Sequence, residues 1–188
     1  MPEWAAVHER REKVHSEALA VKWTLPEEGW LKANADGALS KLEDRRGGGV
    51  VLRDHEGPFR LRGGAACIFP GVAEPELGEV LAARNAVQMA AQAGASRVHV
   101  ELDNKGVVAM LTDKAPNLSA VGLIIEDIKK TPLSFVEFRA TWVRRSGKKG
   151  AHVLAREGVH LDADRFWFLQ PPDCILHVLS DEIPGVGA

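Results

Sequence analysis

The chain has 188 residues, of which 45% are hydrophobic and 27% are charged, as expected for one globular domain with additional segments at its ends. Its formal net charge of −2 and its pI of about 6.4 argue against an obligate, high-affinity nucleic-acid binder, which usually carries an excess of Lys and Arg. One local basic cluster is nevertheless present, and it is formed by Arg144, Arg145, Lys148 and Lys149.

The sequence excludes several classes of protein. No apolar run is long enough to span a membrane, and the charged N-terminus lacks the apolar core of a signal peptide. Cys67 and Cys174 match no metal-ligand spacing and are expected to be unpaired thiols, which suits a reducing compartment. We therefore expect an intracellular protein, cytoplasmic or nuclear and not secreted, with no membrane partner. Residues 1–27 are expected to form a helical extension or linker, with a weakly amphipathic helix over residues 3–20.

Three extended segments follow the boundary marked by Pro26 and Gly29. Residues 30–35 alternate apolar and polar side chains, and residues 48–53 and 59–66 flank a polar turn that contains glycine and proline. A turn of this kind between two apolar runs predicts a β-hairpin. The three segments together predict an antiparallel meander.

Helices and strands alternate in the second half of the chain. Pro75 at a first helical position predicts a helix over residues 76–93. Alternation with period two predicts strands over residues 97–102 and 136–142. Shorter helices are expected over residues 105–111, between an N-cap at Asn117 and Pro132, and over residues 151–157.

The predicted order is β-β-β-α-β-α-α-β-α, which indicates an α/β fold. We expect a five-stranded mixed sheet, with three antiparallel strands followed by two parallel ones, flanked by helices. The domain is expected to occupy residues 28–160. Residues 161–188, which are rich in aromatic residues and proline, are expected to form an irregular tail that packs on the domain or trails from it.

Four side chains that can bind metal or protons lie at the ends of these elements. Asp36 follows the first strand, Glu79 lies near the start of the long helix, Asp103 ends the strand over residues 97–102, and His152 lies in the last helix. Each also has an ordinary structural explanation. Asp36 could be a turn aspartate, and Glu79 could be a glutamate stabilised by the helix dipole. Asp103 could be an N-cap, and His152 could be a packed histidine.

The joint pattern favours a metal site. Neighbouring strands of a mixed sheet can end close together, and Glu79 is near the start of the intervening helix. Three carboxylates around one opening supply the hard oxygen ligands that divalent cations prefer. Two such cations about 4 Å apart stabilise both the attacking and the leaving oxygen of an in-line phosphoryl displacement.

The segments around these residues resemble the motifs of the ribonuclease H family. Residues 34–38 (Asn-Ala-Asp-Gly-Ala) are similar to its first motif. Its second motif is similar to Glu79 with the apolar residues that follow it, Ala82, Ala86 and Val87. Residues 102–104 (Leu-Asp-Asn) are similar to its third motif. Residues 145–155 resemble the fourth motif, which usually reads Asn-x-x-Ala-Asp-x-Leu-Ala. In this chain Lys148 stands at the Asn position and His152 at the Asp position, a histidine that some members share.

From about residue 28 to residue 180, the chain resembles most closely the plant ribonuclease H-like domains related to retroelement reverse transcriptases. The segments 29–34, 53–57 and 171–176 agree with that branch. The resemblance implies a metal-dependent endoribonuclease that hydrolyses the RNA strand of RNA–DNA hybrids by a two-metal mechanism with Mg²⁺.

The resemblance also implies roles for the site residues. Asp36 would bridge both metals, Glu79 and Asp103 would complete the shell of the first, and His152 would hold or exchange the second. Because imidazole suits Mn²⁺ better than Mg²⁺, we expect weak activity with Mg²⁺ and better activity with Mn²⁺. Alternatively, His152 does not ligate but titrates near neutral pH and assists product release.

Contacts to the nucleic acid are expected from two sources. Backbone amides near Gly37 and the amide of Asn104 are candidates for reading ribose hydroxyl groups. The basic cluster Arg144, Arg145, Lys148 and Lys149 is a candidate for phosphate contacts.

Three functions remain open at this point: a hybrid-specific endoribonuclease, a nuclease on another nucleic acid, and a non-catalytic module that recognises nucleic acid or protein. The chain could also belong to a larger parent protein or bind a protein partner. The acidic pI, the absent Asn and the N-terminal segment favour the module. The presence of all three carboxylates favours an enzyme, because clustered like charges are costly without a cation.

Overall fold

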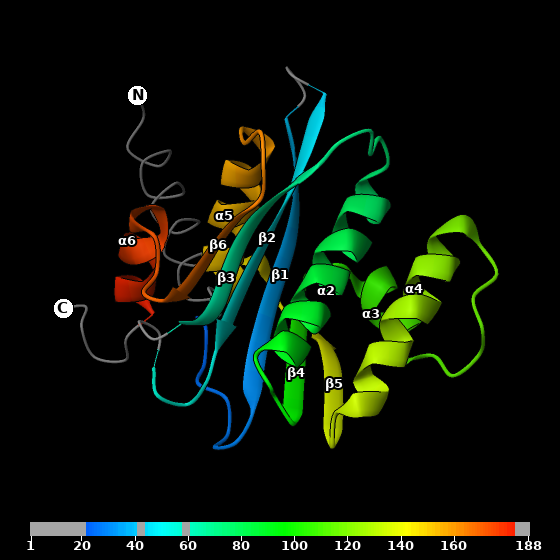
Figure 1. Cartoon of the computed structure of the whole chain (residues 1–188), viewed down its shortest axis with the longest axis horizontal. Helices are drawn as coiled ribbons and strands as arrows, with labels where there is room; N and C mark the ends of the chain where they lie inside the picture. Colours follow the sequence, from blue (N-terminus) through cyan, green and yellow to red (C-terminus); the bar gives the residue numbers. More distant parts are fainter. Residues whose placement is uncertain (1–21, 41–43, 58–60, 183–188) are drawn as a thin grey trace, which may run out of the picture.

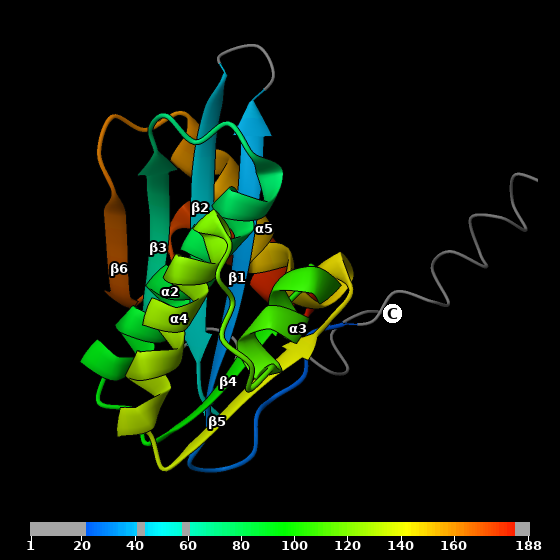
Figure 2. The same cartoon turned by 90° about the vertical axis from the view of Figure 1, so that its right-hand side faces the viewer.

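The computed structural model describes residues 22–40, 44–57 and 61–182, and the helix predicted over residues 3–20 lies outside them. The described residues form a six-stranded sheet in the order β5-β4-β1-β2-β3-β6 (Figure 2). Strands β1, β2, β3 and β6 pair antiparallel in that order, whereas β4 pairs parallel with β1 and with β5. The bounds are β1 Leu31–Ser40, β2 Arg45–Arg53, β3 Leu61–Phe69, β4 Arg97–Leu102, β5 Glu137–Trp142 and β6 Arg165–Leu169.

The prediction of three antiparallel strands followed by two parallel ones is confirmed, but the count of five strands is wrong. The sixth strand, β6, lies in the segment that was expected to be irregular, and it pairs with the edge of β3. Most of its side chains are exposed, so its sequence shows no alternation of buried and exposed positions. Its strand conformation comes from pairing with β3, which no local pattern reveals. The same segment also contains helix α6 (Asp173–Asp181).

The other described helices are α2 (Pro75–Gln92), α3 (Lys105–Thr112), α4 (Ala120–Lys130) and α5 (Lys149–Val159), with short 3₁₀ turns at Thr131–Ser134 and Arg145–Lys148. The N-cap of α4 is Ser119 rather than Asn117, because the Ser119 hydroxyl accepts from the backbone of Gly122. Asn117 instead accepts hydrogen bonds from Ser119 and stabilises the turn before the helix. None of the described helices is long and apolar enough to cross a membrane, and both cysteines are free thiols.

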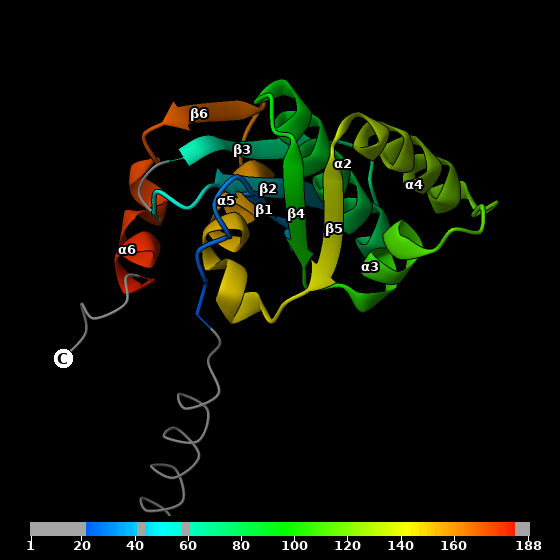
Figure 3. The same cartoon turned by 90° about the horizontal axis from the view of Figure 1, so that it is seen from below.

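The elements form three layers (Figures 1 and 3). Helices α2, α3 and α4 cover one face of the sheet, and α5 and α6 cover the other. Because side chains of a strand alternate between its faces, Val50 and Leu52 of β2 belong to the core under α2, whereas Val51 belongs to the core under α5 and α6.

Both ends of the described chain attach to the face that carries α5. Trp23 is buried, and the guanidinium of Arg53 stacks on its ring at 3.7 Å. Arg53 also forms a buried ion pair with Glu182, which follows α6. The folded body therefore includes residues before position 28 and after position 160.

Helix α5 lies unusually close to β2. A Cβ atom at Gly49 would lie 2.9 Å from the carbonyl carbon of Leu154 and closer still to the carbonyl oxygen of Ala151. Gly47 faces the same helix one turn further on, with the carbonyl carbon of Gly158 at 2.7 Å from the corresponding position. These glycines set how near α5 comes to the end of β1.

Gly49→Ala is expected to lower the free energy of unfolding by about 3 kcal/mol, because the added methyl group meets backbone atoms that cannot move without shifting α5. Chemical denaturation measures this change. Gly150→Ala is the matched control, because its Cβ would lie 3.5 Å from Val51, an ordinary contact, and alanine favours helix by up to about 1 kcal/mol. Equal stability of the two variants would contradict the close packing of α5.

Candidate metal centre

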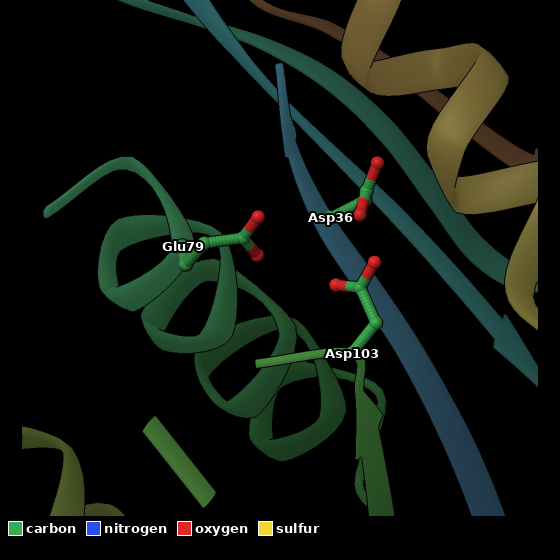
Figure 4. A group of neighbouring side chains, drawn as sticks. All are labelled: Asp36, Glu79 and Asp103. Atoms are coloured by element: carbon green, nitrogen blue, oxygen red, sulfur yellow. The ribbon is translucent and has the colours of Figure 1, made fainter. Parts of the chain in front are cut away.

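Three carboxylates meet at one end of the sheet. Asp36 of β1, Glu79 of α2 and Asp103, directly after β4, each present an oxygen, and these oxygens lie within 4.8 Å of one another. Figure 4 shows the three side chains pointing toward a common space from three different elements. The structure thus brings together the three acidic residues that the sequence pattern selected.

Local structure explains how each carboxylate reaches this position. A Cβ atom at Gly37 would lie 3.1 Å from the carbonyl carbon of Gly78, so the glycine next to Asp36 lets the first turns of α2 approach β1. Asn104 is the N-cap of α3 and accepts from the backbone of Val107 at 3.1 Å. Because Asn104 makes the cap, the side chain of Asp103 turns into the site. Glu79 lies beyond the first turn of α2, so the helix dipole does not account for it.

The ammonium group of Lys148 lies inside this group of carboxylates. Its Nζ atom forms ion pairs with Oδ1 of Asp36 and, at 2.8 Å, with Oδ1 of Asp103. It also donates to the backbone carbonyl of Ala35 at 2.7 Å. The Lys148 side chain is 0% exposed.

His152 of α5 contacts the other oxygen of Asp36. Its Nδ1 atom lies 2.6 Å from Oδ2 of Asp36, and because an ionised carboxylate only accepts hydrogen bonds, Nδ1 carries the hydrogen. Burial raises the pKa of the Asp36 carboxyl, but the hydrogen bond from His152 and the charge of Lys148 outweigh it and leave the pKa below its usual value. Asp36 is therefore ionised and held from both sides.

Glu79 is in the opposite situation. Its Oε2 atom is buried without a hydrogen-bond partner among the described residues. Burial is the main cause that raises the pKa of Glu79 to about 7, the charges of Asp36 and Asp103 add to it, and Lys148 opposes it. Glu79 is thus the one carboxylate of the three whose charge is poorly compensated.

The basic cluster does not form a single surface. Lys148 was expected to contact phosphate, but it is fully buried, so its charge faces the carboxylates rather than solvent. Arg145 is 61% exposed and lies 3.2 Å from Oδ2 of Asp103. Arg144 and Lys149 are exposed beside it. Of the other expected contacts, Asn104 uses its side-chain oxygen as a helix cap, and Gly37 packs against α2.

Two further residues border the site and were not predicted. The indole Nε1 of Trp142 donates to the backbone carbonyl of Asp103 at 3.1 Å, and the ring is 43% exposed. The ammonium of Lys105 lies 4.7 Å from the centre of this ring. Alternation along β5 places Trp142 on the same side as Ala140, which is buried, and only the position of Trp142 at the strand end leaves it exposed.

The antiparallel meander continued by two parallel strands matches the ribonuclease H-like class of folds. Residues 34–158 match the model of the family described as reverse transcriptase-like, and the chain belongs to that family. No protein of curated function matches the sequence. The narrower expectation of a plant, retroelement-related branch stays a prediction.

Solved structures share this fold at low sequence identity. The N-terminal RNase H domain of Rv2228c from Mycobacterium tuberculosis is 20% identical, with a TM-score of 0.61, over 69% of this chain and 93% of that one. RNase H1 from Halobacterium salinarum is 22% identical, with a TM-score of 0.57, over 69% and 96%. LC11-RNase H1, solved in complex with an RNA/DNA hybrid, is 17% identical, with a TM-score of 0.58, over 69% and 96%.

Glu79→Gln is expected to stabilise the chain in the presence of a chelator. The pKa of Glu79 is raised on folding from 4.5 to about 7, so ionisation of this group destabilises the folded state progressively as the pH rises through that interval. The gain in the free energy of unfolding should grow from pH 4.5 to pH 7 and stay constant above, reaching at most about 3 kcal/mol. Denaturation curves at several pH values measure it, and a gain independent of pH would contradict this assignment.

Proposed function

We propose that the chain is a metal-dependent endoribonuclease that hydrolyses the RNA strand of RNA–DNA hybrids. The observation that carries the proposal is the group of three carboxylates within 4.8 Å, built from β1, α2 and the end of β4. Its oxygens are the hard ligands that Mg²⁺ and Mn²⁺ prefer, so the donor set fits a divalent cation. LC11-RNase H1, which has the same fold, was solved in complex with an RNA/DNA hybrid, and this supports the choice of substrate.

Each residue has a specific task in this proposal. Asp36, Glu79 and Asp103 would hold the first cation, and Asp36 would also contribute to holding a second in the two-metal form. Bound there, a divalent cation supplies electrostatic stabilisation to the charge that develops on the phosphoryl group. The buried wall behind Asp36 fixes its orientation, because the side chain is 0% exposed.

His152 contributes through its contact with Asp36. Its Nδ1 atom is used by that hydrogen bond, so a second cation would have to bind through Nε2. An imidazole ligand suits Mn²⁺ better than Mg²⁺, which supports Mn²⁺ as the more effective cofactor.

The nucleic acid is proposed to lie along the exposed edge of the site. Arg144, Arg145 and Lys149 precede or begin α5 at this edge, and Trp142 with Lys105 borders Asp103 on the other side. Cationic groups favour phosphates, and an exposed indole favours stacking on a base or sugar.

Asp36→Asn is expected to reduce cleavage of a labelled RNA–DNA hybrid by about a hundredfold or more, because it removes the carboxylate shared by both cation positions. Cleavage is measured at equal protein concentration in Mg²⁺ and in Mn²⁺, with double-stranded DNA as the substrate control. If Asp36→Asn cleaves the hybrid as fast as the unmodified chain does, the role of Asp36 is refuted. If the unmodified chain cleaves double-stranded DNA as fast as the hybrid, the choice of substrate is refuted.

Lys149→Glu is expected to weaken binding of the hybrid by roughly threefold to tenfold and to lower the salt slope of binding by about one, because one phosphate contact is lost. Fluorescence anisotropy with Asp36→Asn as the background measures binding without cleavage. Lys130→Glu is the matched control, because Lys130 is exposed at the end of α4, before β5 begins, and so at the opposite end of the sheet. An equal loss of hybrid affinity in both variants would contradict a phosphate contact at Lys149, because it would show that only the net charge of the chain matters.

A non-catalytic recognition module is the second candidate, and Lys148 is the observation that favours it. Its ammonium already forms ion pairs with the two aspartates that a metal would need. Binding of the hybrid without cleavage in either metal would support this candidate.

A further inference from the structure

The least expected group in the molecule is the ammonium of Lys148. It has three N–H donors, and three acceptors surround it: Oδ1 of Asp36, Oδ1 of Asp103 and the carbonyl oxygen of Ala35. Two of these acceptors belong to the carboxylates of the candidate metal centre, and the third belongs to the residue next to Asp36. The ammonium therefore has a coordination shell of oxygens like that of a bound cation.

In this arrangement both carboxylate oxygens of each aspartate have a partner. Asp36 contacts Lys148 through Oδ1 and His152 through Oδ2. Asp103 contacts Lys148 through Oδ1 and Arg145 through Oδ2. Each aspartate oxygen thus has a partner that donates a hydrogen bond or carries a positive charge, and little negative charge remains to attract an external ion.

Burial makes the arrangement more than an incidental surface contact. A buried ammonium is costly unless it is paired, and Lys148 and Asp36 are both 0% exposed. Lys148 ends the 3₁₀ turn Arg145–Lys148 and directly precedes α5, the helix that the glycines of β2 hold against the sheet. The backbone that carries this lysine is therefore fixed close to the carboxylates.

We propose that Lys148 is a tethered cation that occupies the metal position of the chain without metal and that a divalent ion has to displace. The inference rests on the proposed metal site and adds a control on its occupancy. Binding of the ion moves the Lys148 ammonium out of the carboxylate group toward solvent. The ion therefore competes with a positive charge held at contact distance, which weakens its binding.

The first test compares Lys148→Met with the unmodified chain. Methionine keeps a long, flexible side chain and removes the charge. In a chelator the variant should melt at a lower temperature, because Asp36 and Asp103 lose their counterion. It should bind Mn²⁺ roughly tenfold or more tightly by calorimetric titration, because no ammonium opposes the ion. Lys130→Met is the control for loss of one positive charge, because Lys130 is exposed at the end of α4, far from the carboxylates, and its melting temperature and Mn²⁺ affinity should be close to those of the unmodified chain.

A third variant separates the inference from the proposed function. Asp36→Asn should abolish Mn²⁺ binding. If it does so while Lys148→Met binds Mn²⁺ no more tightly than the unmodified chain, the metal site stands and the tethered cation is refuted. If Asp36→Asn binds Mn²⁺ as well as the unmodified chain does, the metal site itself is refuted.

A second measurement needs no substitution, so it remains valid if Lys148→Met does not fold. Acylation of lysine amines, followed by mass spectrometry, should leave Lys148 unmodified in a chelator and modify it when Mn²⁺ saturates the site. Lys149 should react equally in both conditions. Protection of Lys148 that is unchanged at saturating Mn²⁺ would overturn the displacement.

Discussion

The constraint on which much of this structure depends is a row of polar side chains on one face of β1. Lys32, Asn34 and Asp36 alternate with the alanines of the opposite core and are almost completely buried. Buried polar groups need partners, and the sheet alone does not supply them all. Lys32 and Asn34 share the carboxylate of Glu101, at 2.9 and 2.8 Å, and Asp36 takes Lys148 and His152 from the segment around the start of α5.

This row also explains why the folded body extends beyond the central domain. Lys32 donates to Thr24 at 2.8 Å, so the segment before β1 is held against the sheet. Asn34 accepts from Arg53 at 3.2 Å, and Arg53 in turn pairs with Glu182 after α6. The charges around one strand therefore connect the first described residues to the last. The candidate metal centre lies at the Asp36 end of this row, where the partner groups come from Lys148 and His152.

The parts of the structure that depend on local patterns could be predicted from the sequence. Strand β4 was predicted at residues 97–102 because its alternation is regular, and the carboxylates were selected because each stands at the end of an element. Strand β6 could not be predicted, because its conformation depends on an edge provided by β3. Lys148 could not be placed either. The other basic residues of its cluster, Arg144, Arg145 and Lys149, are exposed. Lys148 alone is buried, because α5 lies close to β1 in the folded chain.

The position of Lys148 changes what the three carboxylates imply. Clustered like charges are costly without a cation, and this cost favours a metal when the acidic residues are considered alone. Here a cation is part of the chain, so Asp36 and Asp103 are stable without an ion. Glu79 is different, because its buried oxygen has no partner among the described residues and burial raises its pKa to about 7. The charge of Lys148 and a backbone hydrogen bond from Gly37 compensate Glu79 only in part, so it is Glu79, rather than the aspartates, that still favours an ion from outside.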